Sequence, residues 1–246
     1  MTNLDKIIGH KFTQRLLNDS EIISKGRKFK LTDIELENPE FSEYEFYIHN
    51  TGFYYIHFLE LCRQLENAII LLSNFRYDNK TEISRGDHLT YNIENYIIRL
   101  TSITDRTLQV INAVYHLCVD EKDVNERVII NNLKVSRTKL PKHFNEFKKS
   151  LKDYAGERNT IVHRHSFINK QLRKIQIFYH KELTKGMLAD KDIAVGFKEV
   201  RKGVLTKFIS DRKKEFHATN ETCFKTLVPI LDILDEQYET NKQKLK

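Results

Sequence analysis

Residues 53–75 read FYYIHFLELCRQLENAIILLSNF, and apolar side chains recur in them at every third or fourth position. The recurring positions are Phe53, Ile56, Leu59, Cys62, Leu65, Ile69 and Leu72. This spacing follows the 3.6-residue period of an α-helix, so it predicts an amphipathic helix of about six turns. Such a helix has to bury its apolar face against other elements, which makes residues 53–75 the nucleus of the predicted fold.

The same helical period recurs further along the chain. It predicts long helices over residues 89–118 and 220–241, and a third helix that begins near Pro141 and continues to Tyr154. Helix breakers are scarce, with only 8 Gly and 3 Pro, and this favours long helices. We therefore expect an all-α fold, an antiparallel bundle of four to five long helices.

The segments between these helices are harder to assign. Residues 1–50 are predicted to form an irregular N-terminal extension with one short helix, which leaves residues 51–246 as one helical domain. Arg85-Gly86-Asp87 is predicted to lie in a loop, and Ala155-Gly156 to kink the third helix. Within residues 166–195, residues 175–179 fit either a strand or a helical turn, and Lys185-Gly186 and Val195-Gly196 are predicted to be loop points.

Cysteine usage and hydropathy indicate the compartment. Cys62, Cys118 and Cys223 are far apart with no C-x-x-C pair, which argues against a disulfide framework or a thiolate zinc site. The first residues show no signal peptide, and the longest apolar run, residues 68–72, is far too short to span a membrane. We expect a soluble, cytoplasmic protein without a membrane partner.

Positive charge is concentrated in one part of the sequence. Residues 134–214 hold 22 Lys and Arg against 8 Asp and Glu, although the net charge of the whole chain is only +7. A basic block of this kind is typical of a polyanionic partner such as RNA. The alternative is a Lys-rich helical face that is simply solvated.

Inside this block, residues 157–163 read ERNTIVH, which is an R-N-x-x-x-H pattern. Arg158 can neutralise a phosphate at any pH, and His163 can move a proton near neutrality. Asn159 can orient either of them. The Arg-to-His spacing alone carries little weight, because Arg137–His143, Arg173–His180 and Arg212–His217 have similar spacings. The pattern at Arg158 is distinguished by its Asn and by its place after a strongly amphipathic helix.

With these residues the chain resembles the HEPN superfamily, all-helical domains found in many prokaryotic toxin, abortive-infection and CRISPR-associated ribonucleases. Its signature is an Arg, a following polar residue that is often Asn, and a His after four to six intervening residues, which here are Arg158, Asn159 and His163. Residues 94–100, ENYIIRL, continue to Asp105-Arg106 and look like the long second helix of a bacterial HEPN subfamily.

The resemblance implies a metal-independent endoribonuclease that needs no cofactor. His163 would act as general base or acid while the ribose 2′-OH attacks the adjacent phosphate, and Arg158 would stabilise the developing charge. The product would be a 2′,3′-cyclic phosphate. In this family two protomers usually face one another through their motifs, so a homodimer is implied. A toxin or phage-defence role, with an antitoxin or sensor partner, belongs to the same expectation.

The spacing sets a geometric condition on this site. Arg158 and His163 lie five residues apart, so on an unbroken helix their side chains point about 140° apart. A kink at Gly156 or a second protomer is then required. Residues expected to hold RNA are Arg99, Arg106 and Arg164, with Glu94 and Asp105 in support. His163 and His165 do not share a helical face, so no metal site is expected.

Three functional readings stay open from the sequence. The first is the HEPN-type ribonuclease, and the second is a HEPN-like module that binds RNA or protein without cleavage. The third is a helical oligomerisation protein with a coincidental motif, in which Arg158 pairs with Glu157, Asp105 or another acid and His163 is a core histidine.

Overall fold

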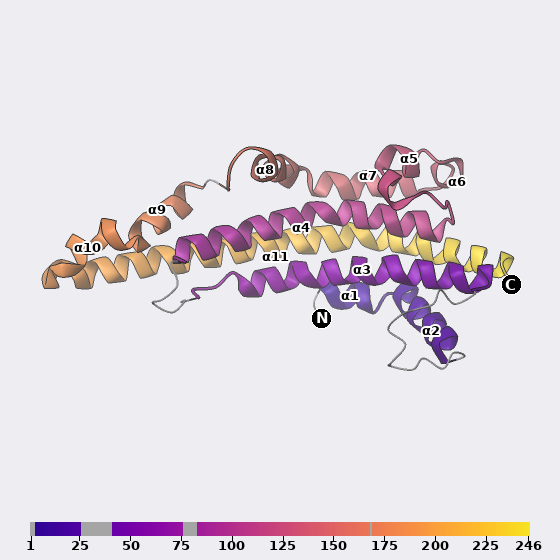
Figure 1. Cartoon of the computed structure of the whole chain (residues 1–246), viewed down its shortest axis with the longest axis horizontal. Helices are drawn as coiled ribbons and strands as arrows, with labels where there is room; N and C mark the ends of the chain where they lie inside the picture. The colour runs from indigo at the N-terminus through magenta and orange to yellow at the C-terminus, as the bar shows by residue number, and fades with distance from the viewer. Residues whose placement is uncertain (1–2, 26–40, 76–82, 168) are drawn as a thin grey trace. The chain divides into compact units, whose positions relative to one another are not determined.

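The computed structural model describes residues 3–25, 41–75, 83–167 and 169–246, and Figure 1 shows them as an all-helical chain. No strand occurs in these ranges, so the predicted all-α class is confirmed. The elements are α1 (Asn3–Ile8), α2 (Lys11–Lys25), α3 (Glu43–Leu71), α4 (Arg85–Val114), the 3₁₀ turn η1 (Glu121–Asp123), α5 (Glu126–Ile130), α6 (Leu133–Ser136), α7 (Leu140–Ser150), α8 (Lys152–His163), α9 (Lys170–Tyr179), α10 (Lys181–Ala189) and α11 (Lys191–Lys244).

The chain divides into two compact units. Unit 1 comprises Met1–Arg63, Ser102–Ser150 and Glu221–Lys246, and unit 2 comprises Gln64–Thr101 and Leu151–Asn220. The three longest of the described helices, α3, α4 and α11, have 29, 30 and 54 residues, and each contributes to both units. Each unit therefore contains sections of the same three helices.

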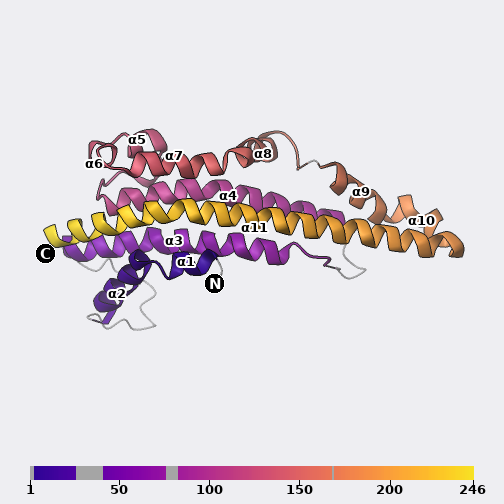
Figure 2. The same ribbon diagram turned by 180° about the vertical axis from the view of Figure 1, so that it is seen from behind.

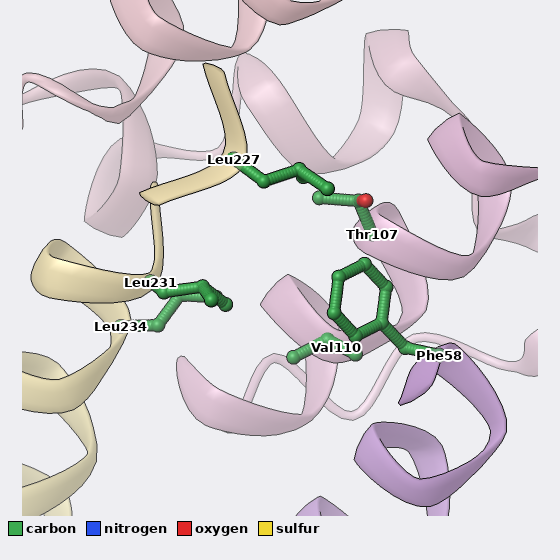
Figure 3. A pocket seen from close by; sticks show the side chains of 6 residues that line it. All are labelled: Phe58, Thr107, Val110, Leu227, Leu231 and Leu234. Carbon is green, nitrogen blue, oxygen red and sulfur yellow. The ribbon is translucent and has the colours of Figure 1, made fainter. Parts of the chain in front are cut away.

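The core of unit 1 forms where α3, α4 and α11 run side by side (Figures 1 and 2). Apolar side chains of the three helices meet around a narrow crevice (Figure 3), which is lined by Phe58, Thr107, Val110, Leu227, Leu231 and Leu234. The three leucines recur at spacings of four and three on α11 and are buried, as the period of residues 220–241 predicts. The crevice is too narrow for a water molecule, so it belongs to the packing of the core.

Polar contacts tie α2 to α11 within unit 1. The Tyr238 hydroxyl donates to the Asp19 carboxylate over 2.9 Å, and the Lys242 ammonium donates to the same oxygen over 2.7 Å. Arg15 Nε lies 2.8 Å from Asp235 Oδ1. Burial, together with Asp19, raises the pKa of Tyr238, so its hydroxyl stays protonated and remains a donor.

Unit 2 has a second core built on α4 and α11. The Tyr96 ring stacks on Phe216 with the ring centroids 3.7 Å apart, and its hydroxyl donates to Asn220 Oδ1 over 3.0 Å. The Asn220 amide in turn donates to Glu66 of α3 over 3.1 Å. Asn220 is fully buried, so this chain of hydrogen bonds satisfies a polar side chain inside the unit.

Two helices begin earlier in the chain than the sequence pattern predicted. α3 begins at Glu43, ten residues before the predicted start, because Ser42 and Glu45 form a capping box in which each side chain accepts from the other's backbone N–H. α4 begins at Arg85, where a loop was expected, because Ser84 and Asp87 cap its first turn in the same way.

The first half of the stripe predicted for residues 53–75 is also wrong. Phe53 and Ile56 are about half exposed, at 48% and 53%, whereas Tyr55 and Phe58 are buried. From Cys62 onward the predicted positions Cys62, Leu65, Ile69 and Leu72 are all buried. Residues 53–59 are apolar on nearly every side, so periodicity cannot select the face that packs.

α4 ends earlier than predicted. Its last residue is Val114, and the Asn112 side chain closes the following turn through both backbone groups of Val119. His116 and Cys118 adopt positive φ angles of 49° and 56° in this turn. The backbone therefore leaves the helical path four residues before the predicted end at Cys118.

The remaining differences lie in residues 3–25, in residues 170–189 and at the start of α11. Residues 3–25 form two helices where one was expected. Residues 170–189, ambiguous in sequence, form α9 and α10. α11 begins at Lys191 instead of residue 220, because the Asp190 side chain accepts from the backbone N–H groups of Asp192 and Ile193 and caps the helix.

Among the described residues, no helix combines the length and apolarity needed to cross a membrane.

Candidate functional site

The R-N-x-x-x-H residues all lie on α8, and α8 is unbroken from Lys152 to His163. The predicted kink at Gly156 is wrong: the break between α7 and α8 lies earlier, at Leu151. The backbone of α8 stays helical through Gly156, and Thr160 donates its hydroxyl to the Gly156 carbonyl over 3.1 Å. Arg158 and His163 therefore leave the helix about 140° apart.

α8 presents two different faces. Tyr154, Glu157, Arg158 and Ile161 are half-buried and follow a three- and four-residue spacing, so they form the inner face. Asn159 and His163 are exposed and lie four residues apart on the outer face. None of the residues of α8 is fully buried.

Asn159 connects the two faces. The Arg158 guanidinium turns toward the outer face and donates from Nη1 to Asn159 Oδ1 over 3.5 Å, a long hydrogen bond. Residues at i and i+4 on a helix have Cβ atoms about 5–6 Å apart, so Asn159 is also a direct neighbour of His163. The Arg158 guanidinium thus contacts an exposed side chain that lies one helical turn before His163 on the outer face.

Two contacts assumed in the oligomerisation reading are not found in the described residues. His163 is exposed, so it is not a core histidine. Within the part of the chain that the structure describes, Arg158 forms no ion pair with Glu157, and its hydrogen bond goes to Asn159 instead. The cation and the imidazole are therefore accessible to a ligand.

Tyr154 anchors the beginning of α8 to α11 in unit 2. Its hydroxyl donates to Glu215 Oε1 over 2.9 Å and lies 3.1 Å from the Thr219 hydroxyl. Burial raises the pKa of Tyr154, so the hydroxyl remains protonated. The sequence places Tyr154 only in an apolar stripe, because periodicity carries no information about a partner 61 residues away.

Glu157 lies beside the motif on the inner face. Its Oε2 atom is buried without a hydrogen-bond partner within the described part of the chain. Burial raises the pKa of Glu157, while the positive charge of Arg212 opposes that shift and Glu215 and Asp153 add to it. Glu157 is thus a carboxylate whose ionised form is poorly solvated.

Comparison with protein families decides the classification. The family described as HEPN_Cthe2314-like HEPN matches residues 17–210, which is well over half of the chain. The chain belongs to this HEPN family. Neither the curated proteins nor the solved structures contain a match to it.

In this HEPN chain, the segment after the motif is held by α4 and α11. The backbone N–H of Phe167 donates to Glu94 Oε1 over 2.6 Å. The Arg212 guanidinium lies over the Phe167 ring at 5.3 Å, and its Nη1 contacts both carboxylate oxygens of Glu215 at 2.9 and 2.7 Å. These contacts position the chain that follows His163.

The other predicted site residues are distributed over both units. Arg99 is half-buried in unit 2 and donates to Gln64 of α3 over 2.9 Å, and Arg164 is exposed directly after α8. Asp105 and Arg106 are exposed on α4 but belong to unit 1. Among the described residues, no group of three or more His, Cys, Asp or Glu has the arrangement of a metal site.

Proposed function

We propose that this HEPN protein is a metal-independent endoribonuclease with Arg158, Asn159 and His163 at its site. One observation carries the proposal: Asn159 contacts the Arg158 guanidinium and neighbours His163 on the accessible surface of α8. A phosphodiester at this surface meets a fixed positive charge, an amide and a titratable imidazole. Cleavage of RNA by attack of the ribose 2′-OH on the adjacent phosphate requires groups that move a proton and stabilise negative charge, and these residues can do both.

The reaction divides into two proton transfers. His163 removes the 2′-OH proton while the 2′ oxygen forms a bond to phosphorus, and Arg158 neutralises the charge that develops on the non-bridging oxygens. The bond from phosphorus to the 5′ oxygen breaks, and that oxygen takes up a proton as it leaves. The products are a 2′,3′-cyclic phosphate and a 5′-OH end.

A second protomer completes this scheme. One imidazole acts as the base, and His163 of a facing copy supplies the acid for the leaving oxygen. α8 supports this arrangement because none of its residues is fully buried, and because Val162, next to His163, is 46% exposed. Facing copies also overcome the 140° angle between Arg158 and His163 on one helix, since Arg158 of one copy can bind the phosphate that lies at His163 of the other. A toxin or phage-defence role, with an antitoxin or sensor partner, is part of the same proposal.

The test incubates the full-length protein with single-stranded RNA in EDTA. We expect wild-type cleavage with cyclic-phosphate ends, and a loss of about 10²–10⁴-fold for His163→Ala and Arg158→Ala. His217→Ala and Arg127→Ala remove exposed residues of the same types elsewhere and should cleave normally. Abolition of cleavage by EDTA would contradict the metal-free mechanism.

A second measurement tests whether cleavage depends on the dimer. Val162→Asp places a charge on the exposed face of α8, and we expect it to reduce both the dimer fraction in light scattering and the cleavage rate. If the wild type binds RNA but leaves it intact in every buffer, the protein is a non-catalytic RNA-binding module. If it neither binds nor cleaves RNA, the nucleic-acid proposal is wrong.

A further inference from the structure

Two arginines from different helices meet on one tyrosine ring in unit 2. The Cζ atom of Arg85 lies 4.5 Å from the centroid of the Tyr179 ring, and the Cζ atom of Arg201 lies 5.0 Å from it. Arg85 opens α4, Tyr179 ends α9 and Arg201 lies on α11, so three separate elements converge here. All three side chains are only partly buried and stay accessible from solvent.

The close approach of α9 to α4 depends on Gly86. A Cβ atom at this position would lie 2.5 Å from Gln176 Cγ and 3.1 Å from Gln176 Cα. Because any larger residue would push α9 away, the glycine sets the distance at which Arg85 reaches Tyr179. The pairing is thus built into the backbone of unit 2.

The electrostatics of this cluster favour an anion. The two guanidinium groups bring two positive charges to one ring, whose π-face attracts cations. Within the described ranges, Arg201 forms no ion pair, and its other close neighbour is the ring of Phe197, 5.7 Å away. A phosphate beside the Arg201 guanidinium would accept charge-assisted hydrogen bonds from it.

A positively charged stretch of chain leads from α8 to this cluster. Residues 158–181 contain six Lys and Arg and not a single Asp or Glu. Three of these basic residues, Lys170, Arg173 and Lys174, are exposed on α9. α9 follows α8 in unit 2 and ends at Tyr179 (Figure 1), so the charges extend from the motif to the arginine pair.

We propose that Arg85, Tyr179 and Arg201 form a phosphate-binding site for single-stranded RNA, and that this site holds the strand whose scissile bond lies at α8. The inference rests on the proposed ribonuclease function. A strand of RNA repeats its phosphates along its length, which suits cations that follow one another over α9 and end in a guanidinium pair. Guanidinium groups also offer flat surfaces on which an unpaired base can stack.

The experiment measures binding separately from cleavage. Full-length protein carrying His163→Ala is titrated against a fluorescently labelled single-stranded RNA at several salt concentrations, and binding is read as anisotropy. We expect Arg201→Gln in this background to weaken binding about tenfold. The slope of log K against log salt should become shallower by about 0.7, the value for one lost phosphate contact on a single strand.

Matched variants test whether the cluster of Arg85, Tyr179 and Arg201 is responsible for RNA binding. Arg127→Gln removes the same charge from an exposed position of unit 1 and should bind as tightly as the parent. Tyr179→Phe keeps the ring and should bind normally, whereas Tyr179→Leu removes the surface shared by both arginines and should bind as weakly as Arg201→Gln. Circular dichroism and thermal melting confirm that each variant is folded.

The outcomes separate this inference from the proposed function. Equal binding by Arg201→Gln and Arg127→Gln would overturn the phosphate site even if the wild type cleaves RNA. Competition by polyglutamate as strong as that by RNA would also overturn it, because the site would then select an acidic protein. If the wild type never cleaves RNA but Arg201→Gln weakens binding and Arg127→Gln does not, the phosphate site stands and the ribonuclease proposal fails.

Discussion

Unit 1 and unit 2 share the same three long helices but differ in charge. Unit 1 carries 21 Lys and Arg against 21 Asp and Glu, whereas unit 2 carries 20 against 13, so the net charge of +7 lies entirely in unit 2. In unit 1 the charged groups of α2 pair with those of α11, as in Arg15 with Asp235. The positive and negative charges balance in unit 1, whereas unit 2 keeps an excess of positive charge beyond ion pairs such as Arg212 with Glu215.

The successive helices α7 and α8 show the same contrast locally. α7, in unit 1, buries Leu140, Phe144 and Phe147, whereas none of the residues of α8, in unit 2, is buried. α7 is therefore held by hydrophobic burial, while α8 is held by the hydrogen bonds of Tyr154. A helix whose side chains are not buried in the core can present them to a substrate.

The largest expected effect compares one residue from each of these helices. Phe147→Ala should lower the free energy of unfolding by about 3–5 kcal/mol, because it leaves a cavity in a fully buried site. His163→Ala should change it by no more than about 0.5 kcal/mol, since the side chain is exposed. Urea denaturation measures both. A comparable loss in the two variants would mean that His163 has a structural role and would break the contrast.

A glycine pair gives the next largest effect. Gly86→Ala should destabilise the protein by about 1–3 kcal/mol, because the new methyl group meets Gln176 of α9. Gly156→Ala should instead stabilise α8 by about 0.5–1 kcal/mol, because a Cβ there meets no atom within 4 Å and the helix is continuous. Thermal melting distinguishes the two signs. Destabilisation by Gly156→Ala would instead indicate that α8 is kinked at Gly156, as the sequence predicted.

The smallest effect depends on pH and concerns Glu157. Its pKa is raised above the ordinary value of 4.5, mainly by burial, so the folded state disfavours the ionised carboxylate. Glu157→Gln should therefore raise the melting temperature at neutral pH. The gain should disappear as the pH falls below 4.5, where the wild-type carboxyl is protonated in both states. The partly exposed Glu146→Gln of unit 1 serves as the control, and a gain that persists at low pH would contradict this account.

Several features were predictable from local sequence because they depend on neighbours within a helical turn or two. The stripe of Phe224, Leu227, Leu231, Leu234 and Tyr238 is buried throughout, as its period predicts. The capping box at Ser42 and Glu45 is also a local signal, and reading it would have placed the start of α3 correctly. By contrast, the face that α3 buries between Phe53 and Leu59 has no such signal, since apolar residues surround the helix there.

The sequence by itself determined the all-helical class, the R-N-x-x-x-H residues and the excess of positive charge around them, because composition and short spacings record these properties directly. Only the tertiary structure decided that α8 is continuous and that Asn159 links Arg158 to the face of His163. It also decided the pairing of Glu94 with Phe167, 73 residues away, and the convergence of two arginines on Tyr179. Such contacts arise when separate helices pack, and no local period encodes which distant side chains will meet.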